Sequence, residues 1–503
     1  MVYAARIRTD ITPSREAVHD YFKQGDLVPV YRRLLADLET PVSVFMKLAK
    51  VGDISFLLES VEGGEQVGRY SFLGVNPKGL MRFKNGELTV TMDGATTTRQ
   101  LEAGEDPLHA LQAEFDKVTP VKLPGLPRLV GGAVGYLSYD IVRYFEKLPE
   151  ENPDDLNVPD AAFMLPDTVV IFDHAKHQLI VLANAHNTGD PDAAYNDAVR
   201  RIDQIVVALG NPLPSIPYTE APLNDELVSN VARDVYEENV RRAKEYIAAG
   251  DAFQIVLSQR FGRKTNASPL MIYRAVRALN PSPYMFYLNF GNDFTLLGAS
   301  PEMMVRYEDG IATMRPIAGT RKRGLTDEED KALEEELLQD PKERAEHVML
   351  IDLGRNDIGR VSEYGSVKVT DMMIVERYSH VMHIVSQVDG KVRDNMNAFD
   401  LFRATFPAGT LSGAPKVRAM QIIEELETTR RATYGGAVGY FSYDGSMDTC
   451  ITIRAVLMQG DQAYIQAGAG IVADSDPASE YEETVNKAKA LAVAIAYAEQ
   501  GLM

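Results

Sequence analysis

The chain has 503 residues, 45% hydrophobic and 25% charged, as expected of a soluble globular protein with two domains or one large core. The formal net charge of −20 excludes nucleic acid and anionic membranes as general partners, so an anionic substrate would need local cations. The single cysteine, Cys450, excludes intrachain disulfides, and no signal-peptide pattern or membrane-length apolar run is found, which together predict a cytoplasmic protein.

The first half of the chain is predicted to be rich in β-strands. Helices are expected over 28–39, 107–118 and 193–209, and strands over 54–60, 68–74, 80–92, 129–140 and 168–183. The segment 211–224 contains four prolines and is the best linker candidate. It divides the chain into an N-terminal β-rich half, 1–215, and a second half, 225–503.

The second half alternates strands with longer helices. Helices are expected over 229–249, 326–353 and 415–426, the second broken at Asp340-Pro341. Strands are expected over 253–261, 285–290, 295–297, 303–307, 367–389, 433–444, 449–458 and 462–472. After the last strand, Asp476 caps a helix that has Pro477 at its first position, where a proline loses no hydrogen bond.

One sequence is repeated between the two halves. GGAVGYLSYD at 131–140 recurs as GGAVGYFSYD at 435–444, and the residues of 56–60 faintly resemble those of 295–300. A spacing of about 300 residues excludes a solenoid. The repeat therefore predicts two diverged β-rich halves in an α+β fold, a large antiparallel β-sheet sandwich with helices packed outside.

Two helices carry paired carboxylates one turn apart. Glu480 and Glu483 share a face with Lys487, and Glu343 and Glu346 repeat the spacing after Asp340-Pro341. A solvated helix face explains either pair alone about equally well, and Glu343 alone is better explained by the helix dipole. Together the two helices could hold one divalent cation, and four carboxylates favour Mg²⁺ over Zn²⁺.

Further residues could bind a rigid anion. The segment PIAGT offers the backbone N–H groups of Gly319 and Thr320. In CITIR, strict alternation would place Arg454 on the same small, polar face as Cys450, where it could clamp a carboxylate, although a surface arginine is an equal alternative. The basic cluster 321–323 is another candidate, against the commoner alternative of a solvated loop.

Six motifs in this order resemble those of the chorismate-utilising enzymes, and among them the large subunits of anthranilate synthases. The resemblance is dense over 231–490 and sparser before it. The motifs are PIAGTRKRG, ERAEHVMLIDLGRND, FPAGTLSGAPK, YGGAVGYFSYD, DTCITIR and QAGAGIVADSDPASEYEET.

The resemblance implies roles for individual positions. Glu346 and Glu483 would bind Mg²⁺ directly, and Glu343 and Glu480 through water. Glu302 would protonate the departing C4 hydroxyl of chorismate, and His383 would assist pyruvate elimination. The groups that would meet the substrate are Tyr434, Arg454, Lys487, Gly319, Thr320 and the backbone of Gly468, Ala469 and Gly470.

Two positions indicate the reaction within the family. Isochorismate and salicylate synthases carry a lysine where Gln254 lies, and aminodeoxychorismate synthases carry a nucleophilic lysine where Ala318 lies. The resemblance thus implies amination of chorismate by ammonia, giving anthranilate as the first committed step of tryptophan synthesis. Alternatives are 2-amino-2-deoxyisochorismate synthase, aminodeoxychorismate synthase, or a metabolite-binding regulatory protein on the same fold.

The resemblance also implies partners and regulation. Cys450 lies in an apolar strand and cannot serve a glutamine amidotransferase, so a separate amidotransferase subunit should supply ammonia in a hetero-oligomer. Two segments resemble those that hold inhibitory L-tryptophan in the family. The residues assigned to this site are Glu59, Ser60, Pro283, Tyr284 and Met285.

Overall fold

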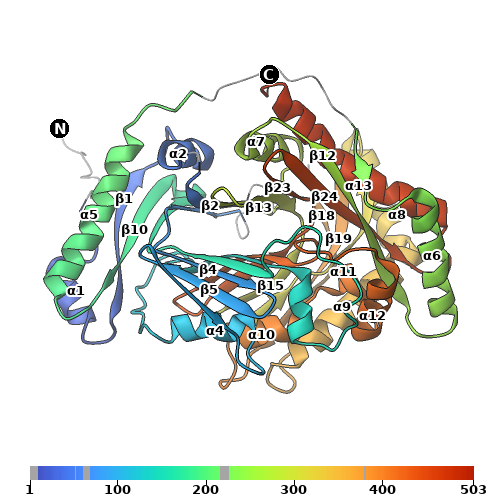
Figure 1. The fold of residues 1–503 in the computed structure, drawn as a ribbon, viewed down its shortest axis with the longest axis horizontal. Helices are drawn as coiled ribbons and strands as arrows, with labels where there is room; N and C mark the ends of the chain where they lie inside the picture. Colours follow the sequence, from blue (N-terminus) through green and yellow to red (C-terminus); the bar gives the residue numbers. More distant parts are fainter. Residues whose placement is uncertain (1–9, 51, 61–67, 216–225, 379–380, 503) are drawn as a thin grey trace.

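Two large antiparallel sheets lie face to face, with helices on their outer faces (Figure 1). The computed structural model describes residues 10–50, 52–60, 68–215, 226–378 and 381–502. Each sheet has 12 strands, and each contains strands from both halves of the chain. The α+β sandwich predicted from the sequence is confirmed.

The first sheet has the order β1-β10-β9-β3-β2-β13-β14-β23-β24-β12-β11, with β20 pairing β12. Its N-terminal strands meet its C-terminal strands where β2 pairs β13. The bounds are β1 Leu27–Leu35, β2 Ile54–Glu59, β3 Tyr70–Val75, β9 Thr168–Asp173, β10 Gln178–His186, β11 Val228–Ser229, β12 Gln254–Lys264, β13 Tyr284–Phe290, β14 Thr295–Ser300, β20 Gly413–Ala414, β23 Ala455–Gln459 and β24 Gln462–Ile471.

The second sheet has the order β17-β19-β16-β15-β22-β21-β7-β8-β4-β5-β6, with β18 pairing β19. Here the two halves meet where β7 pairs β21. The bounds are β4 Gly79–Lys84, β5 Glu87–Met92, β6 Ala95–Gln100, β7 Gly132–Leu137, β8 Ala161–Leu165, β15 Met303–Glu308, β16 Ile311–Met314, β17 Ile317–Lys322, β18 Lys368–Arg377, β19 Val381–Lys391, β21 Ala437–Ser442 and β22 Met447–Ile451.

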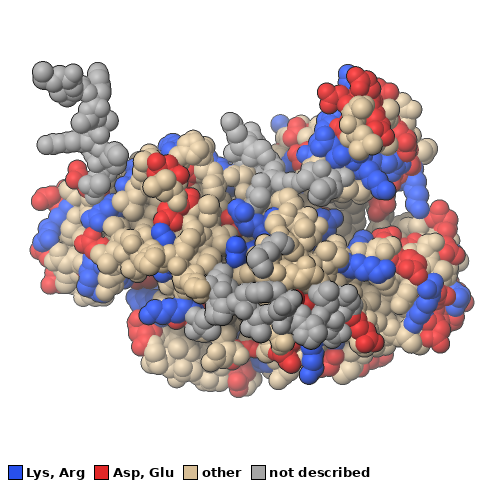
Figure 2. All heavy atoms as spheres, turned by 90° about the horizontal axis from the view of Figure 1, so that it is seen from above, with Lys and Arg blue, Asp and Glu red and all other residues tan. Residues whose placement is uncertain are grey.

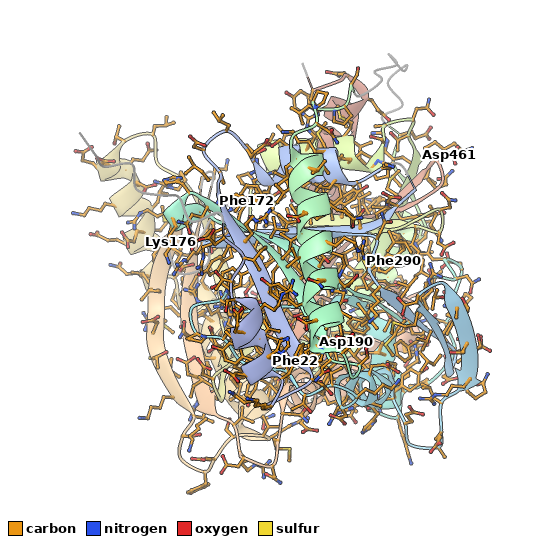
Figure 3. The ribbon with its side chains drawn as sticks, turned by 90° about the vertical axis from the view of Figure 1, so that its left-hand side faces the viewer. Phe22, Phe172, Lys176, Asp190, Phe290 and Asp461 are labelled. Atoms are coloured by element: carbon orange, nitrogen blue, oxygen red, sulfur yellow. The ribbon has the colours of Figure 1, made fainter. Side chains whose placement is uncertain are left out.

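Helices cover the outer faces and bury apolar layers beneath them. A third apolar layer fills the space between the sheets. Figure 3 shows α5 lying across the outer face of the first sheet. No described helix is long and apolar enough to cross a bilayer. The bounds are α1 Arg15–Tyr21, α2 Pro41–Leu48, α4 Pro107–Phe115, α5 Pro191–Leu209, α6 Arg233–Ala248, α7 Pro269–Leu279, α8 Asp327–Gln339, α9 Pro341–Gly359, α10 Ala398–Thr405, α11 Gly409–Ser412, α12 Lys416–Leu426 and α13 Pro477–Glu499.

The helix predicted over 28–39 is wrong, because this segment forms strand β1. All nine residues of β1 pair with β10, a strand that is remote in sequence. Val28 and Val30 are fully buried against the helices of the outer layer. Valine favours the pleated, half-buried surface of a sheet, and this long-range pairing overrides the local spacing of apolar residues. The helix in this region, α2, starts only at Pro41.

The repeated sequences lie side by side across an approximate two-fold axis. In the second sheet Gly135 pairs with Gly439, and the pairs on either side exchange equivalent positions of the repeat. The first sheet has the same symmetry, since Phe286 pairs with Leu58 and Leu288 pairs with Phe56. Both sheets therefore join the two halves at symmetry-related strands, and the halves share their core.

This symmetry corrects the fainter repeat, which the sequence analysis placed at 56–60. The position of β14 in the first sheet corresponds to that of β3, and 71–77 matches 295–301. A Cβ atom on Gly74 would lie 2.4 Å from the Phe56 ring, and one on Gly298 would lie 2.6 Å from the Phe286 ring. Each half thus uses one glycine to admit an aromatic ring from the neighbouring strand.

The close approach of strands at the junction predicts a large effect of adding one methyl group. A Cβ atom on Gly439 would lie 2.1 Å from the carbonyl oxygen of Asp448 on β22. We expect Gly439→Ala to lower the free energy of unfolding by about 2 kcal/mol or more, measured by chemical denaturation. Gly359→Ala is the matched control, because nothing lies within 4 Å of its Cβ position. Equal stability of the two variants would contradict the tight junction.

Candidate active site

The predicted site residues lie on neighbouring elements in the second half of the chain. They come from β12, β17, β19 and β24, from helices α9 and α13, and from the turns around Glu302 and Arg454. Interactions between neighbours connect them. Gln254 donates a hydrogen bond to Glu346, and Lys487 donates one to the carbonyl oxygen of Gly468. A Cβ atom on Gly319 would lie 3.2 Å from a carboxylate oxygen of Glu343. The charge of Arg454 lowers the pKa values of both Glu302 and His383.

Strand β24 lines the cleft with glycines that leave room for two side chains. A Cβ atom on Gly468 would lie 2.6 Å from the Tyr434 hydroxyl, and one on Gly470 would lie 2.6 Å from Nε2 of Gln254. Lys487, on the first turns of α13, donates to the carbonyl oxygen of Gly468 at 2.9 Å. The strand end therefore presents a phenol, an amide and an ammonium at the surface of the cleft.

The two carboxylate-bearing helices begin as the sequence predicts. Asp340 caps α9 and Asp476 caps α13, each followed by proline. Burial and the charges of Glu343 and Glu483 raise the pKa of Glu346, and burial and Glu483 raise that of Glu480. These effects place the carboxylates of both helices within electrostatic range of one another.

The carboxylates are not gathered into a closed metal cage. Among the described residues, no three His, Cys, Asp or Glu side chains converge on one metal position. Gln254 donates to Glu346 at 3.4 Å, Arg321 pairs with Glu343, and Lys487 pairs with Glu483. An open set of oxygen donors suits Mg²⁺, which usually keeps several waters and takes one or two protein carboxylates together with substrate oxygens.

His383 is held as a neutral base. Burial lowers the pKa of its imidazole, so the ring is uncharged at neutral pH. Its Nδ1 lies 2.8 Å from the carbonyl oxygen of Gly319 and 3.1 Å from the Thr320 hydroxyl. A carbonyl oxygen can only accept, so Nδ1 carries the proton and Nε2 has the free lone pair.

Glu302 is a protonated acid in its surroundings. Burial raises the pKa of its carboxyl to about 8, against the lowering effects of Thr410 and Arg454. Thr410, on the short helix α11, donates to Oε1 of Glu302 at 3.0 Å. Ile451 donates its backbone N–H to the carbonyl oxygen of Glu302, which fixes the turn that carries the acid.

Arg454 reaches this cleft by a route that the sequence did not predict. Strand β22 ends at Ile451, and Arg454 has a φ of +50°, so the alternation that would place it beside Cys450 breaks. Cys450 is buried between the sheets, whereas Arg454 opens into the cleft. The Arg454 side chain is exposed overall, yet desolvation of its guanidinium lowers its pKa, and the charge of Glu302 opposes that effect.

Sequence reasoning missed a buried arginine behind the site. Arg431 is 3% exposed and forms an ion pair with Glu427. It also donates to the carbonyl oxygens of Leu411 in α11 and Val256 in β12, and its guanidinium lies 5.8 Å from the centre of the Tyr434 ring. This one side chain therefore connects the elements that carry Thr410, Gln254 and Tyr434.

The basic cluster 321–323 is not a free anion site. Arg321 pairs with Glu336, Asp340 and Glu343, and Arg323 pairs with Asp330. On the face seen in Figure 2, basic side chains lie among acidic ones.

The comparison with known proteins identifies the family. A family model described as chorismate binding enzyme matches residues 54–493. The chain belongs to the chorismate-binding enzymes. It is 48% identical over 490 residues to anthranilate synthase component 1 of Acetivibrio thermocellus, covering 96% of this chain and 98% of that one. It is 47% identical to the component 1 of Aquifex aeolicus, covering 97% and 98%.

Solved structures of the family share the fold. Anthranilate synthase component I from Streptococcus pneumoniae TIGR4 superposes with a TM-score of 0.76 at 37% identity, covering 91% of this chain and 99% of that one. The menaquinone-specific isochorismate synthase of Escherichia coli gives a TM-score of 0.69 at 18% identity, covering 96% and 99%. The second likeness concerns the fold alone.

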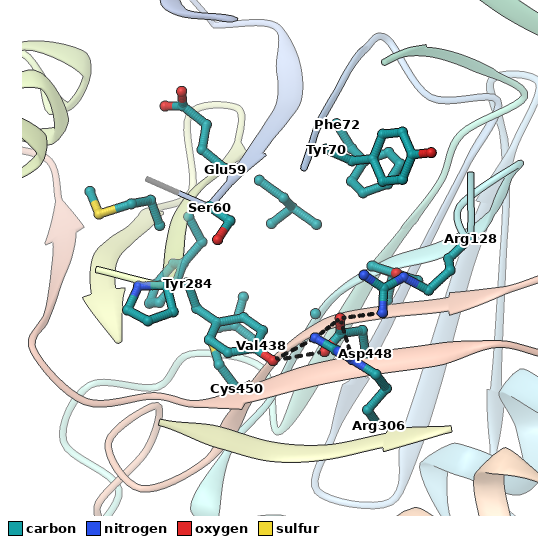
Figure 4. A pocket seen from close by; sticks show the side chains of 16 residues that line it. Glu59, Ser60, Tyr70, Phe72, Arg128, Tyr284, Arg306, Val438, Asp448 and Cys450 are labelled. Atoms are coloured by element: carbon teal, nitrogen blue, oxygen red, sulfur yellow. Dashed lines mark hydrogen bonds and ion pairs between the residues drawn. The ribbon is translucent and has the colours of Figure 1, made fainter. Parts of the chain in front are cut away.

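The residues assigned to an inhibitor line a second cavity, at the junction of the two halves (Figure 4). Its cavity volume is about 60 Å³. An interaction network at one side joins Asp448 with Arg306, Arg128 and the Tyr284 hydroxyl. The carboxylate of Glu59 bonds Tyr273 and Arg277 of α7. The five predicted residues are Glu59, Ser60, Pro283, Tyr284 and Met285.

The buried arginine behind the site predicts a strong effect on stability. In Arg431→Met the carboxylate of Glu427 loses its charged partner in the interior, which should lower the free energy of unfolding by about 3 to 5 kcal/mol. Arg355→Met is the matched control, because Arg355 pairs with Asp352 at the surface and should change stability by less than about 1 kcal/mol. Chemical denaturation measures both, and similar losses in the two variants would contradict the assigned role.

Proposed function

We propose that the protein aminates chorismate with ammonia and eliminates pyruvate, giving anthranilate. The observation that carries the proposal is the uncharged amide of Gln254, which donates to Glu346, in a site where burial also raises the pKa of the acid Glu302. A glutamine cannot deprotonate water, so the position that would activate water in an isochorismate synthase is inert. Ala318, buried in β17, leaves no lysine nucleophile for the para-amination.

The first step requires an acid at C4. Ammonia adds to C2 of the ring, the two ring double bonds each shift by one position, the C4–O bond breaks, and the new ammonium group at C2 gives up a proton to solvent to become the amine. Hydroxide is a poor leaving group, so Glu302 gives its proton to the C4 hydroxyl, which leaves as water. A carboxyl with a pKa of about 8 is still protonated at neutral pH and can serve this role.

The second step requires a base. Removal of the C2 proton and loss of the enolpyruvyl group as pyruvate make the ring aromatic. Neutral His383 is suited to assist this step, because its Nδ1 proton is held by the Gly319 carbonyl and Nε2 is free to accept a proton. Desolvation and the positive charge of Arg454 both disfavour the protonated imidazolium, which favours the neutral base.

Chorismate is a dianion, and the cleft of this acidic protein must bind it. Arg454, Lys487 and the Tyr434 hydroxyl are suited to the carboxylates. The carboxylates of Glu346 and Glu483, with Glu343 and Glu480 behind them, are suited to Mg²⁺. Bound there, Mg²⁺ would neutralise the facing glutamates and one substrate carboxylate.

The nitrogen source is free ammonia, delivered in the cell by a glutamine-hydrolysing partner. Cys450 is 2% exposed, and burial raises the pKa of its thiol far above neutrality, so it cannot act as a glutaminase nucleophile. The names of the relatives, component 1, support a two-component assembly.

The experiment that tests the function is product analysis. The purified chain, chorismate, Mg²⁺ and an ammonium salt should give anthranilate and pyruvate in equal amounts. Glutamine in place of ammonium should give no anthranilate from the isolated chain. Formation of isochorismate, of 4-amino-4-deoxychorismate, or of an aminated product without pyruvate would each reject the proposal in a distinguishable way.

The glutamates of α9 and α13 predict a requirement for Mg²⁺ in catalysis. Glu346→Gln and Glu483→Gln should each reduce kcat/KM for chorismate by at least about 100-fold, because each removes charge that faces the cation and the substrate. Glu482→Gln, one residue away but paired with Arg233 at the surface, is the control and should be nearly unaffected. Steady-state rates across a Mg²⁺ titration measure this; near-normal rates in either site variant would exclude the assigned metal position.

The second cavity supports feedback inhibition by L-tryptophan. Tyr70, Phe72 and Met285 offer apolar walls for an indole, and Arg128 and Arg306, which both pair with Asp448, line the same cavity. The cavity and the active site also share two strands. Arg306 lies on β15, which starts directly after Glu302, and Asp448 lies on β22, which leads to Arg454. A ligand that shifts these strands would alter chorismate affinity, and chorismate would weaken tryptophan binding by the same factor.

The cavity gives a prediction for inhibition. Ser60→Phe places a ring in the cavity and should abolish tryptophan inhibition and binding while leaving uninhibited turnover within about twofold. Ser60→Ala is the control, because it keeps the cavity open and should remain inhibited. A tryptophan titration by rate and by calorimetry measures both. Equal inhibition of the Phe variant and the parent, or no binding to the parent, would contradict the assignment.

A further inference from the structure

Thr410 makes a specific contact with the acid. Its hydroxyl donates to Oε1 of Glu302 at 3.0 Å, and this side-chain bond is the hydrogen bond that acts on the buried carboxyl. Glu302 lies on the turn before β15, whereas Thr410 lies on α11 more than 100 residues later. The contact therefore depends on the tertiary fold, which explains why sequence reasoning did not assign Thr410 a role.

The surroundings of α11 hold Thr410 in place. A Cβ atom on Gly409 would lie 2.8 Å from the Leu353 side chain of α9, so the helix start is pressed against α9. The hydroxyl of Ser412 donates to the carbonyl oxygen of Ala408, and Arg431 donates to that of Leu411. Bonds on both sides of Thr410 thus fix its backbone, and its hydroxyl meets one chosen oxygen of Glu302.

We propose that Thr410 is a positioning residue that selects which oxygen of Glu302 carries the catalytic proton. By donating to one lone pair of Oε1, the hydroxyl favours Oε1 as the carbonyl oxygen of the acid, so the proton resides on Oε2, which is left to serve the substrate. This inference rests on the proposed function, since it assumes that Glu302 is the acid. It adds a residue without which that acid would rotate and present either oxygen.

The proton balance of the step follows from this arrangement. The Oε2–H bond breaks and its proton joins the C4 hydroxyl, while the C4–O electron pair leaves with the departing water. The negative charge that remains on the Glu302 carboxylate is stabilised by the Thr410 hydroxyl, whose bond to Oε1 strengthens as that oxygen gains charge. Thr410 thus acts on the acid both before and after the proton is transferred.

The charged group that acts on Glu302 is Arg454, which lowers the pKa of the carboxyl, as the Thr410 bond also does. Two uncharged groups also bond this turn, the backbone N–H of Ile451 and the Ser300 hydroxyl. Loss of the Thr410 hydroxyl should therefore raise the pKa of Glu302. The acid would stay protonated to higher pH but would be misdirected.

The test compares Thr410→Val with Thr410→Ser. Rates are measured with chorismate and Mg²⁺ from pH 6 to 10 at a fixed concentration of free ammonia, so that only the protein titrates. We expect Thr410→Val to lower kcat about tenfold, to leave KM for chorismate within about twofold, and to move the alkaline limb of kcat/KM to higher pH. Thr410→Ser keeps the hydroxyl and should have the kcat and the alkaline limb of kcat/KM of the parent.

Two results would overturn the proposal. One is a Val variant that has the parent rate and the parent alkaline limb of kcat/KM. The other is a Ser variant that is as impaired as the Val variant, which would indicate that the loss comes from altered packing of the side chain. The Glu302→Gln variant distinguishes failure of the role of Thr410 from failure of the proposed function. If Glu302→Gln retains the parent rate, Glu302 is not the acid and both fall. If it is inactive while Thr410→Val is normal, only the role of Thr410 falls. Circular dichroism melting verifies that each variant is folded.

Discussion

Desolvation in the cleft is the constraint on which the site depends. The same burial raises the pKa of Glu302 and Glu346 and lowers those of His383 and Arg454. It thereby produces an acid that keeps its proton and a histidine that stays neutral. In water the acid would be ionised at neutral pH and the histidine would be partly charged. The sandwich of two sheets, each shared by both halves, removes the water.

The two halves of the chain have the same packing about the approximate two-fold axis but carry different residues at equivalent positions. The counterpart of Glu302 in the first half is Lys78, which is exposed, so the same turn carries an acid in one half and a surface cation in the other. Helix α5 corresponds to α13 and also starts with Asp-Pro, but Ala194 lies where Glu480 would be expected. The first half retains the packing of the repeat without the chemistry, and the second cavity lies between the halves.

The sequence predicted features that are encoded locally. The caps at Asp340 and Asp476, the paired glutamates and the glycines of β24 each depend on a few neighbouring residues, and the structure has them as expected. The strand β1 was mistaken for a helix because its burial is set by pairing with β10, about 150 residues away. Local alternation could not reveal the bend that turns Arg454 into the cleft.

The residues that support the site could not be predicted for the same reason. Arg431 and Thr410 act through carbonyl groups and carboxylates that approach them only in the folded chain. A buried arginine in a polar stretch resembles a surface arginine in sequence. Short motifs therefore point to candidate site residues, whereas the groups that hold them in place are visible only in three dimensions.

The ionisation of the Glu302 carboxyl can be measured directly. Carbon-13 NMR of protein labelled at glutamate side-chain carboxyls, recorded from pH 5 to 10, should show one carboxyl that is protonated at pH 7 and titrates near the pKa of about 8. This signal should be absent from Glu302→Gln. Complete ionisation of every glutamate carboxyl by pH 6 would show that burial does not keep Glu302 protonated.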